Sequence, residues 1–68
     1  MNLFEILKSN LDNSFVEMCC KTDSLDKFTI HAKATGIMMI VYDCRLCKLI
    51  TKEELNELNN IYIDIQNK

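Results

Sequence analysis

The segment from Gly36 to Ile50 constrains the fold of this chain more than any other. It is uncharged and apolar from Ile37 to Tyr42, and Asp43 is the first charged residue to interrupt it. A helix that is apolar on most of its faces must be buried on several sides. A chain of 68 residues has little material for this, because domains of this size bury only about 60% of their unfolded surface. The segment therefore predicts a central helix, a subunit interface, or both.

The composition indicates an all-α fold in a single domain that spans residues 1–68. Hydrophobic residues make up 49% of the chain and the net charge is −2, a combination that argues against disorder. Proline is absent and Gly36 is the only glycine, whereas turn-rich β sandwiches and disulfide scaffolds use many more of both. We expect three helices that form a hairpin-type bundle around a long central helix.

The first helix is predicted over residues 2–20. Leucine and phenylalanine recur every fourth residue at Leu3, Leu7, Leu11 and Phe15, which marks one helical face that Met18 or Cys19 continues. Asn2 and Glu5 have the spacing of a capping box. Polar residues at 9–10 and 12–14 compete for backbone hydrogen bonds, and they can break this helix in two.

The second helix is predicted over residues 23–49, with Thr22 or Asp23 as its N-cap. Spacings of three and four residues alternate along it without a slip, as in the a and d positions of a heptad repeat. The repeat consists of Leu25, Phe28, Ala32, Thr35, Met39, Tyr42, Leu46 and Leu49. After Gly36 a second apolar face begins, made of Ile37, Ile40, Val41, Cys44 and Cys47.

The third helix is predicted over residues 52–66, where Leu55, Leu58, Tyr62 and Ile65 form one apolar face with Ile61 beside it. The start of this helix is the clearest local signal in the chain. Thr51 and Glu54 have capping-box spacing, while Ile50 and Leu55 occupy the hydrophobic-staple positions around the cap. The segment Leu49–Leu55 resembles a joint found in short helical proteins of Gram-positive bacteria and their phages, including the SHOCT-type domain. That resemblance is confined to these residues and implies no function. The short connection predicts that the second and third helices are antiparallel neighbours.

An α-β-β-α fold is the alternative. Residues 28–32 alternate as a strand would, and Gly36 could turn the chain into a second strand at residues 37–43. The unbroken heptad repeat and the lack of a two-residue hairpin turn favour the helix.

The cysteines give the most direct suggestion of chemistry. Cys44 and Cys47 have CxxC spacing, and Cys19 with Cys20 could complete a zinc site. In a helical hairpin, however, the two pairs would lie roughly 30 Å apart along the second helix, too far for one subunit to close the site. An antiparallel dimer could bring the pairs together, so a metal-binding module is a further alternative function. We interpret Cys44 and Cys47 as small buried hydrophobic residues. His31 has no cysteine or carboxylate at i±4 and therefore lacks a partner for catalysis or metal binding. From this and from the interpretation of the cysteines we predict no catalytic residue, no metal ligand and no cofactor.

Nucleic-acid binding requires a basic surface. Arg45, Lys48 and Lys52 cluster around the second turn, but the third helix carries Glu53 and Glu57 among its acidic residues and would repel phosphates. A DNA-binding or transcription-regulating module of bacterial, phage or mobile-element origin remains the alternative function. Almost every basic residue is lysine, and isoleucine and asparagine are frequent. This composition is typical of AT-rich coding and is the reason for considering such an origin.

We predict a small non-enzymatic protein-interaction module or regulator that acts through helix-helix docking. Its partner is expected to be itself, as a homodimer or larger assembly, or another helical protein. The N-terminus lacks the features of a signal peptide and no apolar run is long enough to span a membrane, so a cytoplasmic location is expected. The predicted interface residues are Ile37, Met38, Ile40, Val41 and Tyr42.

Overall fold

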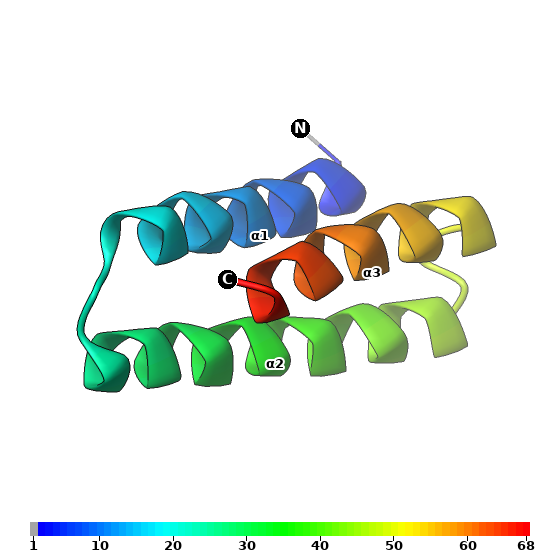
Figure 1. The fold of residues 1–68 in the computed structure, drawn as a ribbon. Helices are drawn as coiled ribbons and strands as arrows, with labels where there is room; N and C mark the ends of the chain where they lie inside the picture. The colour runs from blue at the N-terminus through cyan, green and yellow to red at the C-terminus, as the bar shows by residue number, and fades with distance from the viewer. Residues whose placement is uncertain (1) are drawn as a thin grey trace.

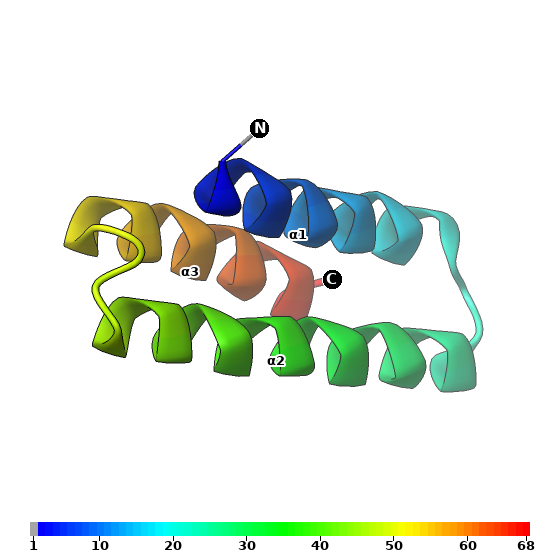
Figure 2. The same ribbon diagram turned by 180° about the vertical axis from the view of Figure 1, so that it is seen from behind.

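A computed structural model describes residues 2–68 as an antiparallel bundle of three helices (Figure 1). Helix α1 spans Leu3–Cys20, α2 spans Ser24–Leu46 and α3 spans Lys52–Gln66. Each helix packs against both others, and the bundle measures 37 × 18 × 18 Å. Figure 2 shows from behind that α3 lies between α1 and α2, and it packs against both of them. The predicted all-α fold is confirmed, and the two strands of the alternative fold lie inside α2.

The three helix starts are fixed by side-chain caps, which satisfy backbone N–H groups that a first turn leaves unpaired. The Asn2 Oδ1 atom accepts a 2.8 Å hydrogen bond from the Glu5 amide. Asp23 caps α2, since its Oδ1 atom accepts from the Leu25 amide at 2.7 Å. At α3 the predicted capping box is present in both directions, between the backbone and side chain of Thr51 and those of Glu54.

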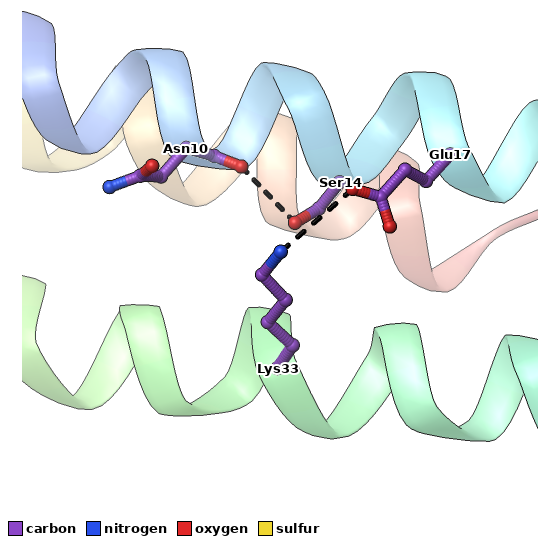
Figure 3. Close-up of polar contacts among 4 residues, drawn as sticks. All are labelled: Asn10, Ser14, Glu17 and Lys33. Atoms are coloured by element: carbon purple, nitrogen blue, oxygen red, sulfur yellow. Dashed lines mark hydrogen bonds and ion pairs between the residues drawn. The ribbon is translucent and has the colours of Figure 1, made fainter.

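Helix α1 is continuous through its polar middle, contrary to the expectation that these residues can break it. Ser14 is fully buried, and its hydroxyl donates a 3.1 Å hydrogen bond to the Asn10 carbonyl oxygen one turn earlier (Figure 3). This local bond satisfies the hydroxyl without interrupting the helix. On the adjoining surface the Lys33 ammonium lies 3.8 Å from the Glu17 carboxylate and links α2 to α1.

Helix α2 ends at Leu46, three residues before the predicted end. The amide of Lys48 donates to the Arg45 carbonyl oxygen and the amide of Leu49 donates to that of Cys44, at 3.0 and 2.8 Å. This pair of bonds is a Schellman motif, which requires a left-handed residue after the C-cap. Lys48 takes that role with a φ of 61°, and it is the one non-glycine residue in the described chain with positive φ. The prediction erred because glycine usually marks this position and none is present here.

The core is a layer of apolar side chains between the three helices, with Ile50 closing the end near the second turn. Its buried members are Leu7, Leu11, Met18, Ile30, Ala34, Met38, Val41, Cys44, Ile50, Leu58 and Ile65. In α1 and α3 the buried residues belong to the faces that the sequence predicts, apart from Ser14. In α2 no residue of the heptad repeat is buried, and of the second apolar face only Val41 and Cys44 are. The other buried residues of this helix are Ile30, Ala34 and Met38.

Candidate interaction surface

The heptad repeat of α2 faces away from α1 and α3. We call this surface the outer strip and define it as Leu25, Phe28, Ala32, Thr35, Met39, Tyr42 and Leu46 of α2 followed by Leu49 in the turn. Every member is exposed. Phe28 retains 69% of its accessible surface and Leu46 retains 81%. The heptad repeat therefore does not pack into the subunit's own core.

Asp43 explains why this face lies outside. It follows Met39 by four residues and precedes Leu46 by three, so it projects from the same side of the helix. Two helices pack against α2, and together they cover a wide arc of its surface. If that arc included the outer strip, the Asp43 carboxylate would be buried without a partner, which is strongly unfavourable. The buried residues of the opposite arc, from Ile30 to Cys44, are all uncharged.

The buried face of α2 and the outer strip meet at adjacent methionines. Met38 retains 2% of its accessible surface in the core, whereas Met39 retains 66% on the outer strip. A rotation of about 100° per residue separates their side chains, which is enough to move one from the core to solvent. The sequence does not distinguish the two methionines, because apolar spacing alone fits either face.

The structure separates the five predicted interface residues. Met38 and Val41 are buried in the subunit's own core, and Ile37 is half-buried against it. The Met38 and Val41 side chains are therefore not free to contact another molecule, and Ile37 keeps only part of its surface accessible. Ile40 and Tyr42 are exposed, and of these Tyr42 belongs to the outer strip. It stays a prediction that the five residues contact a partner. Of the five, only Ile40 and Tyr42 are exposed at the surface.

One edge of the outer strip adjoins α3 through hydroxyl groups. The Thr35 Oγ1 atom lies 2.8 Å from the Tyr62 hydroxyl oxygen, and the Tyr42 hydroxyl donates a longer 3.4 Å bond to Asn59 Oδ1. The other edge carries Thr29, Gly36 and Asp43 by helical position. No atom outside the helix's own backbone lies within 4 Å of a Cβ built on Gly36, so this edge opens directly to solvent.

The cysteines occupy different environments. Cys44 is buried as expected, but Cys47 is the exposed C-cap of α2, and the interpretation of Cys47 as a core residue is wrong. Cys19 and Cys20 are exposed at the end of α1, and the α1–α2 turn lies at the opposite end of the bundle from the end of α2 (Figure 1). Within residues 2–68 no group of three or more histidine, cysteine or carboxylate side chains is placed to hold a metal ion.

The remaining candidate groups are dispersed. His31 is half-buried, and its carbonyl oxygen accepts the hydroxyl of Thr35 at 2.9 Å. Arg45, Lys48 and Lys52 gather at the α2–α3 turn as predicted, with the Arg45 guanidinium donating a long 3.4 Å bond to the Ile50 carbonyl oxygen. The described part of the chain encloses no pocket. None of its helices is both long enough and apolar enough to cross a bilayer.

Comparison of the chain with protein-family models, with curated proteins and with solved structures finds no match in any of the three. The candidate site therefore stands on its geometry: a continuous, exposed apolar surface along one side of α2.

Proposed function

We propose that this protein is a small non-enzymatic interaction module of the cytoplasm, which works by docking a partner helix on the outer strip of α2. The observation that supports the proposal is the exposure of the heptad repeat. Large apolar side chains recur along α2 with the spacing that helices use to pack on each other, and none of them packs into the core.

The extent of this surface supports the proposal further. Scattered apolar side chains are normal on protein surfaces, whereas a continuous patch usually marks an interaction site. Leu25 and Leu46 are separated by about 30 Å along the helix at 1.5 Å per residue, and the whole molecule is 37 Å long. The patch thus runs along most of one side of the bundle.

A second candidate function is DNA binding or transcription regulation, in a protein of bacterial, phage or mobile-element origin. The basic residues at the α2–α3 turn favour it, since Lys48 and Lys52 are both exposed there. Against it, α3 begins with Glu53 and Glu54 and carries Glu57 on its surface, which weakens attraction to phosphate. Salt-dependent retention on duplex DNA would favour this function, and no retention at low salt would exclude it.

The interaction proposal is tested by the native mass of the protein in an extract of cells that produce it. We expect the wild-type chain to migrate above its 7.9 kDa monomer mass, and Met39→Lys to migrate as the monomer. Val16→Lys is the matched control, because Val16 is an exposed apolar residue on α1 at a distance from the strip. If wild-type protein and both variants all migrate at the monomer mass, the proposed function is wrong.

A further inference from the structure

We infer that the outer strip binds a second copy of this chain, with the two α2 helices antiparallel and the two Gly36 residues beside the twofold axis. The inference rests on the proposed function and names its partner. The dimer inferred here uses a different face of α2 from the interface predicted from the sequence. Met38 and Val41 of that predicted interface are buried in the subunit's own core.

The spacing of the strip indicates a helical partner with the same spacing. A repeat of seven residues places apolar side chains every 3.5 residues on average, slightly fewer than the 3.6 of a straight helix. Such a strip stays in register along its whole length only with a helix that coils around it. In a twofold dimer the same surface faces itself, so a second α2 has the matching period automatically.

The residues around the strip favour a protein partner over a membrane surface. An amphipathic helix that lies on a membrane carries lysine and arginine beside its apolar face. Here the positions flanking the strip on its open side are Thr29, Gly36 and Asp43, and the whole chain has a net charge of −2. A carboxylate and neutral side chains suit the margin of a protein interface, where the rim is polar and solvated.

Gly36 indicates the antiparallel orientation. The strip runs from Leu25 to Leu49, so its midpoint is residue 37, next to the only glycine in the chain. In an antiparallel pair the twofold axis crosses the strip at its midpoint, and each open edge meets the same edge of the other copy. Gly36 then lies opposite Gly36 of the partner subunit. In a parallel pair the two open edges lie on opposite sides of the interface.

Gly36 also has no function within the monomer that the structure shows. It lies inside a helix, where glycine is less favourable than alanine, and a Cβ at this position would meet open space. A missing side chain at the crossing point of two helices lets their backbones approach closely. The antiparallel dimer thus gives a physical reason for a residue that the isolated subunit does not need.

The antiparallel register places small side chains opposite large ones in the two pairs nearest the axis. With the axis at residue 37, Ala32 faces Tyr42 of the partner subunit, and Thr35 faces Met39 of the partner subunit. Phe28 faces Leu46 of the partner subunit, and Leu25 faces Leu49 of the partner subunit. A small side chain opposite a large one fills the space between helices more evenly than like against like, as close packing requires.

A stable dimer requires only a modest part of the subunit surface. A specific interface removes about 800 Å² from each partner, and the accessible surface of the subunit is 4605 Å². The required area is therefore less than a quarter of the total. The outer strip runs along most of one long side of the bundle.

Sedimentation equilibrium of the purified full chain over micromolar to millimolar concentrations tests the dimer. We expect wild-type protein to dimerise and Met39→Lys to raise the dissociation constant at least about tenfold. The control Val16→Lys should leave it unchanged. A wild-type chain that remains monomeric to millimolar concentration overturns the inference, and so does a dimer that Ile40→Lys dissociates while Met39→Lys does not.

A charge pair tests the orientation. Phe28→Lys and Leu46→Glu should each weaken the dimer, and the double variant should dimerise more tightly than either single variant. In the antiparallel register each new lysine faces a new glutamate, whereas a parallel dimer would place lysine on lysine and glutamate on glutamate. Both residues are exposed in the subunit, so far-UV circular dichroism should confirm that the variants fold. A double variant weaker than both single variants overturns the antiparallel arrangement.

Gly36→Leu provides a second measurement that leaves the subunit core untouched. Two added side chains at the axis should raise the dissociation constant at least about tenfold, and an unchanged constant would overturn the position of the axis. The inference and the proposed function can fail separately. A purified chain that stays monomeric, together with a high native mass in extract that Met39→Lys abolishes, means that a different protein occupies the strip.

Discussion

The hydroxyl oxygens of Thr35 and Tyr62 lie 2.8 Å apart and join α2 to α3 at the edge of the outer strip. Each hydroxyl has one hydrogen to donate. Thr35 uses its hydrogen for the His31 carbonyl oxygen at 2.9 Å, so Tyr62 donates to Thr35 and in turn accepts from the Gln66 Nε2 atom at 2.8 Å. The result is a directed chain of three hydrogen bonds that crosses between two helices.

Removing the Tyr62 hydroxyl should destabilise the fold modestly. Tyr62→Phe deletes two bonds of this chain, and because the bonds are solvent-exposed we expect a loss of about 0.5–1 kcal/mol in the free energy of unfolding. Urea denaturation monitored by circular dichroism measures it. Tyr42→Phe is the control, since the Tyr42 hydroxyl makes only the longer 3.4 Å contact and should matter less. A larger loss for Tyr42→Phe would contradict the hydrogen-bond chain.

Met38 and Met39 allow a direct comparison of the two faces of α2. Met38→Ala removes a buried side chain and should destabilise the fold by about 2–5 kcal/mol, through lost burial and a cavity. Met39→Ala makes the same chemical change at an exposed position and should alter stability by no more than about 0.5 kcal/mol. Unfolding is measured at a concentration where the protein is monomeric, so that association does not contribute. Equal losses at both positions would show that α2 is rotated differently.

Lys48→Gly should stabilise the protein. The left-handed conformation is unfavourable for lysine by about 1–2 kcal/mol, whereas glycine adopts it readily. Glycine also makes the unfolded chain more flexible, which lowers stability by about 0.4–1 kcal/mol. The free energy of unfolding should therefore increase by about 0.5–1 kcal/mol in total. The midpoint of thermal unfolding reports it. Lys48→Ala serves as the comparison, because alanine retains a Cβ and should give no such gain.

Gly36→Ala should stabilise the monomer by about 0.5–1 kcal/mol, because alanine is the better helix former in a helix interior. The added methyl group meets nothing within 4 Å. Denaturation at low protein concentration measures this effect without a contribution from dimerisation. A destabilised monomer would mean that the surface around Gly36 is not open.

Local signals predicted the ends of the helices well where a side chain fixes them. Asn2, Asp23 and Thr51 cap the three helices through short-range hydrogen bonds, and such bonds depend on residues only two or three positions apart. The stripes in α1 and α3 were also predicted, since each of these helices has only one strongly apolar face. Features that depend on residues close together in the sequence could therefore be predicted without the structure.

The apolar residues of α2 could not predict which face of the helix packs against α1 and α3, because apolar residues lie on two faces. The heptad repeat is the more regular pattern, but regular spacing does not say whether the partner is α1 and α3 or another molecule. Asp43 was the informative residue, since a lone carboxylate beside Met39 cannot be enclosed by two helices. The end of α2 was missed for a different reason: Lys48 adopts a conformation that sequence patterns assign to glycine.

The environments of the four cysteines make the chain a reporter of its own unfolding. The thiols of Cys19, Cys20 and Cys47 are exposed and open to alkylating reagents in the folded protein, whereas that of Cys44 is buried between helices. Cys44 belongs to the same core cluster as Leu11 and Leu58, so its sulfur becomes reactive only when α2 separates from its neighbours. The rate at which the fourth thiol is labelled, after the first three, therefore measures how often the native bundle opens, with no probe added to the sequence.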